Sequence, residues 1–319
     1  MKQMLRLTIA LVAASVLTAP ARAAGETIAV FTKNLTNPHF QGVRVGAEAA
    51  AKGLGVKVIQ YVPTKPDSIP EQLSQVEDVI VKKPDAIVFI PVDYKALVPA
   101  VEKINAAGIP VVNITDRIGG GKVASYIGVD DYTTALATGR ALFRAMGSKG
   151  NVVMLEGVKG TLTNTDRVRG FTDALKEFPN IKLLAAQPAN YQRLNALQAM
   201  ENMIQSFPQI DGVIGLNDAM AIGAIEALEG ANRKAVVIGI NGSREAVELV
   251  KAGKLLATGD FHSFNQGCLG VEIAVKSLRK EPVPAELILK PMVIDKTNYQ
   301  DFEVPVEQRK CPALADMMK

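Results

Sequence analysis

Polar and aromatic side chains follow the first predicted strand of the chain. Residues 27–31 have strand propensity, and a helix is predicted to begin at Pro38, whose fixed φ and missing N–H suit a first helical position. Ligands of parallel α/β sheets bind at the carboxyl ends of the strands. We therefore expect five side chains to face a cleft: Lys33, Asn34, Asn37, His39 and Phe40. On these residues alone, an ordinary strand-to-helix loop without a site is an equal alternative.

A weak internal repeat places further polar residues at strand ends. Residues 83–116 and 207–241 share one order: a turn with Pro and Asp, a short apolar strand, a helix and a second strand. The repeat predicts two lobes built on one plan. Asp116 and Asn241 then lie at equivalent strand ends and face each other across a cleft.

Short apolar runs alternate with amphipathic stretches of helical length along most of the chain. Such runs are typical of buried parallel strands. They occupy residues 56–59, 86–90, 111–114, 125–129, 152–155, 181–185, 212–215 and 236–240. The alternation predicts right-handed crossovers and therefore an α/β fold of two similar Rossmann-like lobes, each a parallel sheet flanked by helices.

The first 23 residues have the features of a secretory signal peptide. Lys2 and Arg6 form a positive region, residues 7–17 are apolar, and an A-x-A cleavage motif ends at Ala23. The apolar run is too short to span a bilayer, so we expect a mature protein in the periplasm. Loss of three basic residues lowers the formal net charge from +4 to about +1. Such a charge argues against nucleic acid as a partner.

The 296 residues left after cleavage exceed what one hydrophobic core usually supports. Strand ends lead directly into new helices at residues 128–131 and 258–263, which indicates crossings between lobes. A last strand is predicted over residues 287–294, and the fold of the tail after it stays open. The predicted lobes, joined by a three-segment hinge, are residues 24–129 plus 262–289 for the N-terminal lobe and 130–261 plus 290–319 for the C-terminal lobe with the tail.

The sequence gives little support for metal or catalytic chemistry. Cys268 and Cys311 are too few and too far apart for a zinc-ligand pattern or a disulfide scaffold. They form either one disulfide or two buried thiols, and both alternatives stay open. The sequence lacks the motifs of serine hydrolases, P-loop proteins and zinc metalloproteases. We therefore expect no enzyme activity, no cofactor and no metal.

Six short motifs lie at predicted strand ends and helix starts. They are Lys33-x-Leu35-x-Asn37-Pro38-x-Phe40, Thr115-Asp116-Arg117, Arg167-x-x-Gly170-Phe171, Gln187-Pro-Ala-x-Tyr191-x-Arg193, Leu216-Asn-Asp-x-Met-Ala221 and Gly239-x-Asn241-Gly242. In this order, and over essentially the whole mature chain, they resemble periplasmic substrate-binding proteins of the ribose/allose type, which serve ABC sugar importers.

The resemblance implies a protein that closes two lobes on one small polar ligand, a monosaccharide or a polyol, and delivers it to the membrane permease of an ABC importer. It also implies a monomer. The ligand-binding residues carried over position by position, with those at the departures described below, are Lys33, Asn37, His39, Phe40, Asp116, Arg117, Arg167, Tyr191, Asn217, Asn241 and Phe261.

The chemistry of these residues suits a sugar, which has hydroxyls around its rim and C–H groups on its faces. Asp116 can accept two hydroxyl hydrogens, while Arg117 and Arg167 donate from planar forks. Phe40 and Tyr191 offer ring faces. We expect Arg167 to act only on the ligand, so that its loss leaves the ligand-free fold nearly intact. The alternatives are a strand-end ion pair of Asp116 with Arg117 and a solvated helix residue at Arg167.

Four positions depart from the family pattern. His39 and Ile240 stand where aromatic residues are common, Asn241 replaces a strand-end acid, and Phe261 takes a place often held by Gln. The missing acid predicts a surplus of positive charge in the cleft, unless Asp260 supplies the carboxylate. A sugar acid or another small oxygenated anion is therefore an alternative ligand. A periplasmic sensor that presents its ligand to a receptor, or an exported enzyme, are alternative functions.

Overall fold

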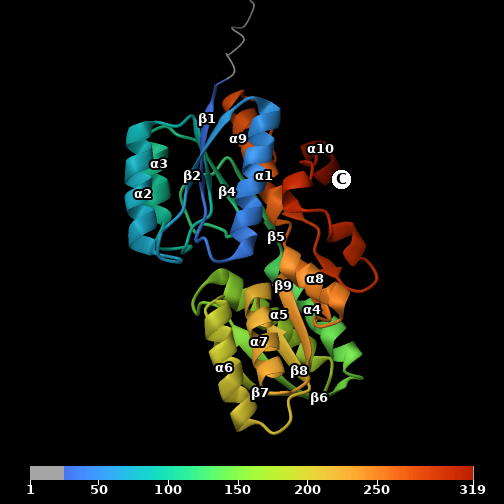
Figure 1. The fold of residues 1–319 in the computed structure, drawn as a ribbon. Helices are drawn as coiled ribbons and strands as arrows, with labels where there is room; N and C mark the ends of the chain where they lie inside the picture. Colours follow the sequence, from blue (N-terminus) through green and yellow to red (C-terminus); the bar gives the residue numbers. More distant parts are fainter. Residues whose placement is uncertain (1–24, 319) are drawn as a thin grey trace, which may run out of the picture.

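The computed structural model describes residues 25–318. The predicted signal peptide, residues 1–23, lies outside this range. Within it the chain forms two six-stranded sheets, each with helices on both faces, and Figure 1 shows one lobe stacked on the other. The α/β class with two lobes is confirmed.

The N-terminal lobe is a parallel sheet with strand order β11-β5-β4-β3-β1-β2. Its strands are β1 (Thr27–Phe31), β2 (Lys57–Tyr61), β3 (Ala86–Phe89), β4 (Val111–Ile114), β5 (Ser125–Val129) and β11 (Glu286–Leu289). Its helices are α1 (Pro38–Leu54), α2 (Ile69–Lys82), α3 (Val98–Ala106) and α9 (Ser263–Leu278).

Alternating side chains of the strands bury both faces of this sheet. In β1, Ile28 and Val30 join the core that includes α1 and α9, whereas Ala29 and Phe31 join the core under α2 and α3. Both faces are apolar because helices cover both, as expected for a parallel sheet.

The C-terminal lobe repeats the plan with strand order β12-β10-β9-β8-β6-β7, in which β12 alone is antiparallel. Its strands are β6 (Lys149–Glu156), β7 (Asn180–Pro188), β8 (Gly212–Gly215), β9 (Val236–Asn241), β10 (Ala257–Asp260) and β12 (Met292–Ile294). Its helices are α4 (Asp131–Ala145), α5 (Leu162–Lys176), α6 (Arg193–Ser206), α7 (Asp218–Gly230) and α8 (Arg244–Ala252).

The chain passes between the sheets at three points: from β5 to α4, from β10 to α9, and from β11 to β12. The single strand expected over residues 287–294 is wrong. Residues 290–291, Lys and Pro, interrupt it, and its halves join different sheets. Pro has no N–H for a ladder, so this residue suits a break between strands.

The tail returns to the N-terminal lobe after leaving the C-terminal one. Glu303, in the first part of the tail, pairs with Lys251 of α8 at 2.6 Å. Further along the tail, Cys311 forms a disulfide with Cys268 of α9. The tail carries two 3-10 turns, Tyr299–Phe302 and Val306–Gln308, and α10 (Leu314–Met317). The open question about the cysteines is thus settled as a disulfide. Within residues 290–319, predicted as part of the C-terminal lobe and the tail, the end of the tail lies on α1 and α9 of the N-terminal lobe.

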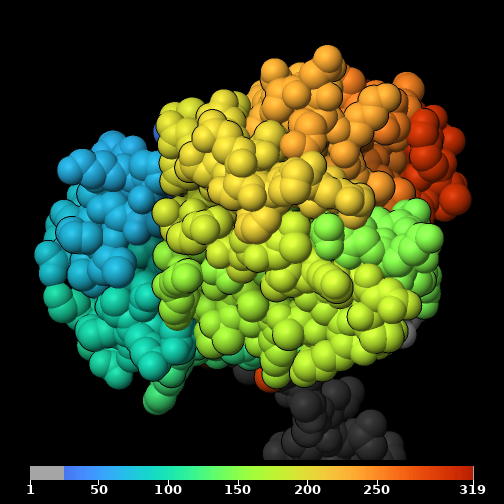
Figure 2. All heavy atoms as spheres, turned by 90° about the horizontal axis from the view of Figure 1, so that it is seen from below, coloured from blue at the N-terminus to red at the C-terminus, as the bar shows by residue number. Residues whose placement is uncertain are grey.

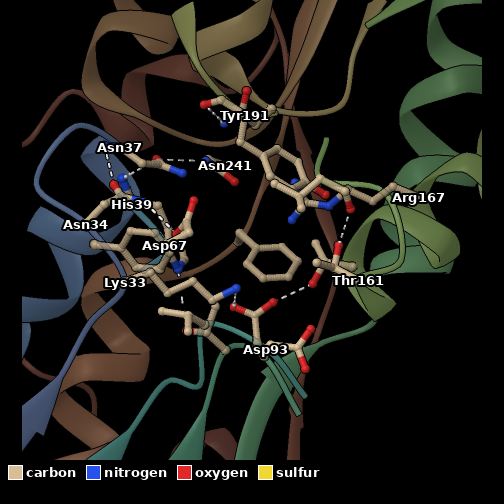
Figure 3. A pocket seen from close by; sticks show the side chains of 18 of the residues that line it. Lys33, Asn34, Asn37, His39, Asp67, Asp93, Thr161, Arg167, Tyr191 and Asn241 are labelled. Atoms are coloured by element: carbon tan, nitrogen blue, oxygen red, sulfur yellow. Dashed lines mark hydrogen bonds and ion pairs between the residues drawn. The ribbon is translucent and has the colours of Figure 1, made fainter. Parts of the chain in front are cut away.

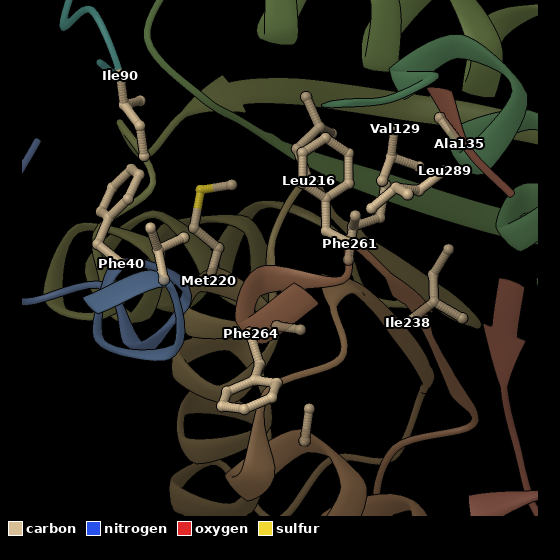
Figure 4. Close-up of a cluster of buried hydrophobic side chains, with 14 of the residues drawn as sticks. Phe40, Ile90, Val129, Ala135, Leu216, Met220, Ile238, Phe261, Phe264 and Leu289 are labelled. Carbon is tan, nitrogen blue, oxygen red and sulfur yellow. The ribbon is translucent and has the colours of Figure 1, made fainter. Parts of the chain in front are cut away.

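Apolar side chains also pack where the two lobes meet. Figure 4 shows Phe40 and Ile90 of the N-terminal lobe beside Met220 of the C-terminal lobe. This shared cluster supports the polar site that lies next to it.

Candidate ligand-binding site

A cavity of about 150 Å³ lies between the lobes, at the carboxyl ends of strands from both sheets. Sites for drug-sized ligands occupy roughly 300–1,000 Å³, so this cavity suits one smaller molecule. Figure 3 shows polar side chains converging on it from both lobes. Ten of the eleven predicted site residues line it: Lys33, Asn37, His39, Phe40, Asp116, Arg167, Tyr191, Asn217, Asn241 and Phe261.

The one predicted residue outside the cavity is Arg117. Its guanidinium bonds to Glu286 of β11 and lies 3.9 Å from the ring centroid of Tyr126, with the side chain about half exposed. Arg117 therefore turns away from the cleft that Asp116 enters. Placing Arg117 in the cavity, or in an ion pair with Asp116, is therefore wrong.

Asp116 is instead held by Lys33 and Thr163. The Lys33 Nζ lies 3.0 Å from one carboxylate oxygen, and the Thr163 hydroxyl donates to the other at 2.5 Å. Burial alone would raise the pKa of Asp116, but Lys33 and Thr163 outweigh it and hold that pKa below its usual value. Burial would likewise lower the pKa of Lys33, but the carboxylates of Asp116 and Asp67 raise it. Both groups are therefore charged at neutral pH.

Arg167 is held in place by hydrogen-bond partners from the C-terminal lobe. It is 3% exposed, its Nε donates to Asp131 at 2.7 Å, and a terminal nitrogen donates to the Leu216 carbonyl at 2.6 Å. The guanidinium carbon lies 4.7 Å from the ring centroid of Phe261, a cation–π distance. Arg167 is thus a buried, fully oriented donor, and the solvated alternative is wrong.

The charges near the cavity do not leave the predicted positive surplus. Lys33 and Arg167 are paired with Asp116 and Asp131. The third cation of the lining, Lys159, is paired with Glu156, and Asp67 and Asp93 add two further carboxylates to the lining. Asp260 supplies no missing acid to the cavity, because it accepts from the His262 backbone and lines a different pocket. The positive surplus on which the anionic-ligand alternative rested is therefore absent from the described residues, so the structure does not favour that alternative.

Two asparagines of the lining cap helices. The Asn37 oxygen accepts from the His39 N–H at 3.0 Å at the start of α1, and the Asn217 oxygen accepts from the Met220 N–H at 2.9 Å at the start of α7. Each cap fixes a side chain at the edge of the cavity. The amide of Asn217 also donates to the backbone of Tyr191 at 3.3 Å, which positions that ring.

Tyr191 reaches the cavity through an unusual backbone turn. Asn190 and Tyr191 have φ values of 54° and 61°, a left-handed conformation that is uncommon for a bulky residue. The turn lays the ring on Gly157, where an added Cβ would lie 2.0 Å from a ring atom. Gly157 therefore provides the space that the ring occupies.

Direct hydrogen bonds join the lobes around the cavity. The Asn241 amide donates to the Asn37 oxygen at 3.3 Å, Thr36 bonds to Gln192 at 3.3 Å, and the bond from Thr163 to Asp116 also crosses. These contacts hold the lobes in a closed arrangement. Seen from below, the C-terminal lobe covers most of the N-terminal lobe, part of which is visible in blue and teal (Figure 2).

Several lining residues did not enter the predicted set. They come from loops after β2, β3, β4 and β6 and from the start of α5, and include Asp67, Asp93, Thr115, Thr161 and Thr163. The repeat gave a signal for Asp93, which follows a predicted strand end. Thr115 directly follows the predicted strand at residues 111–114 and belongs to the Thr115-Asp116-Arg117 motif. Asp67, Thr161 and Thr163 depend on how loops bend, which hydrophobic periodicity does not encode.

Within residues 25–318, no group of three or more His, Cys, Asp or Glu side chains is placed to hold a metal ion. The cavity thus offers hydrogen bonds, paired cations and aromatic faces. This arrangement can bind a small hydroxylated molecule.

Comparisons with known proteins identify several relatives of this chain. A ribose import binding protein from Haemophilus influenzae is 31% identical over 296 residues, covering 93% of this chain and all of that protein. An ABC transporter periplasmic solute binding protein from Actinobacillus succinogenes, solved with bound D-allose, is 35% identical with a TM-score of 0.83, covering 86% of this chain and 99% of that one. An ABC transporter solute binding protein from Bacillus halodurans, solved with bound myo-inositol, is 25% identical with a TM-score of 0.82, covering 88% and 99%.

A family model described as the periplasmic binding protein domain matches residues 28–282, which is most of the described chain. The match runs from β1 to α9 and leaves out β11, β12 and the tail. This chain belongs to the periplasmic binding protein family.

Proposed function

We propose that this protein is the extracytoplasmic binding component of an ABC importer and closes its lobes on a neutral monosaccharide or polyol. The observation that carries the proposal is the interlobe cavity, whose polar groups are fixed and whose nearby charges are paired. A neutral hydroxylated ligand can exchange hydrogen bonds with such groups without leaving a buried charge unpaired.

Different residues of the cavity would recognise different parts of the ligand. Asp116 keeps lone pairs for ligand hydroxyls, because Lys33 and Thr163 leave part of its carboxylate unused. Lys33 supplies further donors, while Phe40 and Tyr191 offer apolar ring surface to C–H groups. Rim and faces of a sugar ring are then both matched.

The wider role follows from the relatives. Their names and structures concern ribose import, bound D-allose and bound myo-inositol, which supports a sugar or polyol as the ligand and an importer as the destination. A permease as partner, a periplasmic location and a monomeric state belong to this proposal. Closure would occur about the three crossings between the sheets.

A thermal-shift screen of the mature protein tests the proposal. The neutral panel is D-ribose, D-allose, xylitol and myo-inositol, and the anionic panel is D-ribonate and D-glucuronate at matched ionic strength. We expect at least one neutral compound to raise the melting temperature, since a ligand at 100-fold its Kd adds about 2.7 kcal/mol to the folded state. Stabilisation by the acids and by none of the neutral compounds would contradict it. Permease and ATPase genes beside the coding gene would support the importer role.

A further inference from the structure

His39 is a buried part of the cavity wall, next to Lys33 and Asn37 in Figure 3. Its side chain is 4% exposed, and its ring meets the edges of Phe40 and Phe261 at centroid distances of 5.2 and 5.6 Å. Among residues 25–318 its Nδ1 has no hydrogen-bond partner. Buried polar atoms of folded proteins are usually paired, so this atom calls for a partner from outside the chain.

A chain of hydrogen bonds decides which ring nitrogen carries the proton. The Gln266 amide nitrogen donates to the Phe261 carbonyl at 2.5 Å, so the Gln266 oxygen faces Thr115. The Thr115 hydroxyl donates to that oxygen at 2.9 Å, which leaves only its lone pairs for His39. His39 Nε2, 3.5 Å away, must therefore be the protonated nitrogen and donate to Thr115. Nδ1 is consequently an unprotonated acceptor.

We propose that Nδ1 of His39 accepts a hydrogen bond from one hydroxyl of the ligand and so makes that hydroxyl a requirement for tight binding. The inference rests on the proposed function and deepens it. A site built to pair with a hydroxyl rejects an analogue that lacks it, because the buried group is then left unpaired. His39 is in this view a specificity-determining residue, not a packing substitute for an aromatic ring.

The ring stays neutral where binding is measured. Burial lowers the pKa of His39 to about 3; the charged groups that act on it are Asp116, which raises this pKa, and Arg167 and Lys33, which lower it. The acceptor is therefore available between about pH 5 and pH 8, and the contribution of His39 to binding should not change across this range.

Three variants separate hydrogen bonding from packing. His39→Asn places a carbonyl oxygen near the position of Nδ1, His39→Gln places its amide near that of Nε2, and His39→Phe keeps a flat ring without nitrogen. For a compound of the neutral panel that binds wild type, calorimetry should show at least about a tenfold loss in His39→Phe, a similar loss in His39→Gln, and a much smaller loss in His39→Asn. Circular dichroism and the melting temperature of each ligand-free variant establish that it is folded.

Monodeoxy derivatives of the same compound identify the hydroxyl. Removal of one particular hydroxyl should weaken binding to wild type but have almost no further effect in His39→Phe, because the two changes delete the same bond. Nitrogen-15 NMR of the histidine ring should show a pyridine-type Nδ1 and a pyrrole-type Nε2 before ligand is added, with the Nδ1 signal moving on binding.

Each result decides a separate claim. If His39→Phe binds as tightly as wild type, if all deoxy compounds lose equally in both proteins, or if Nδ1 carries the proton, the inference is overturned and the proposed function stands. If no neutral compound binds wild type, the proposed function fails and this inference fails with it.

Discussion

Arg167 shows how a residue at a binding site can also be required by the fold. Its guanidinium is buried and bonded to the Asp131 carboxylate and the Leu216 carbonyl. The expectation that its loss would leave the ligand-free fold intact overlooked these partners. An alanine at this position would leave the buried Asp131 carboxylate without its charged partner.

We therefore expect Arg167→Ala to lower the free energy of unfolding of the ligand-free protein by about 3–5 kcal/mol, since one partner of a buried ion pair is removed. Urea unfolding followed by circular dichroism measures the change. Arg169→Ala is the matched control on the same helix: its exposed pair with Asp166 should contribute no more than about 1 kcal/mol. Equal effects of the two variants would show that the buried pair has no special role.

Predictability from sequence differs between neighbouring residues. Asp116 reaches the cavity as predicted, but Arg117 does not, because its partner Glu286 comes from a strand 169 residues away. The sequence pattern that placed both at one strand end gave no information on that partner. Likewise, the acceptor role of His39 depends on Thr115 and Gln266, which meet only in the folded chain.

Helices α1 and α9 approach closely through glycines. A Cβ on Gly267 of α9 would lie 2.0 Å from the Val43 carbonyl, and one on Gly46 of α1 would lie 2.1 Å from the Phe264 carbonyl. The obstacles are backbone atoms, which cannot rotate away. This contact anchors the returning chain segment in the N-terminal lobe.

Gly267→Ala should therefore reduce the free energy of unfolding by about 1–3 kcal/mol or more through overpacking. Gly53→Ala, also in a helix of this pair but with no atom within 4 Å of the added Cβ, should leave stability unchanged or raise it by up to about 1 kcal/mol. Urea unfolding of both variants measures the difference. An unchanged free energy of unfolding in Gly267→Ala would mean that the two helices can move apart without loss of stability.

At the scale of elements, most strands and helices could be predicted because their apolar runs and start signals are local. The start of α1 at Pro38 is as expected. The break at residues 290–291 was missed because an apolar run does not reveal that its halves join different sheets.

The tail connects the whole molecule on one side. It begins beside α8 and ends on α9, where the disulfide fixes it, and Figure 1 shows it in red running from one lobe to the other. The repeat predicted two lobes, because each lobe follows one plan. The tail has no counterpart in the repeat, so its path could not be predicted.

Reduction of the disulfide should lower the free energy of unfolding by about 2–4 kcal/mol, because the bond closes a loop with a sequence separation of 43. Thermal or urea unfolding with and without a reductant measures this change. The Cys268→Ala/Cys311→Ala double variant should resemble the reduced protein and be insensitive to the reductant. Unchanged stability on reduction would contradict a structural role for the bond.

The central claim is that the interlobe cavity binds a neutral sugar or polyol through Asp116 and not through its neighbour Arg117. Calorimetric titration of the best compound of the neutral panel into wild type, Asp116→Asn and Arg117→Ala tests it most directly. Loss of a charged acceptor should weaken binding by about 1.5–3 kcal/mol, roughly 10- to 150-fold, in Asp116→Asn. Arg117→Ala should bind within about twofold of wild type, since its side chain lies outside the cavity and pairs with Glu286. Full affinity in Asp116→Asn, or a comparable loss in Arg117→Ala, would contradict this assignment of the site.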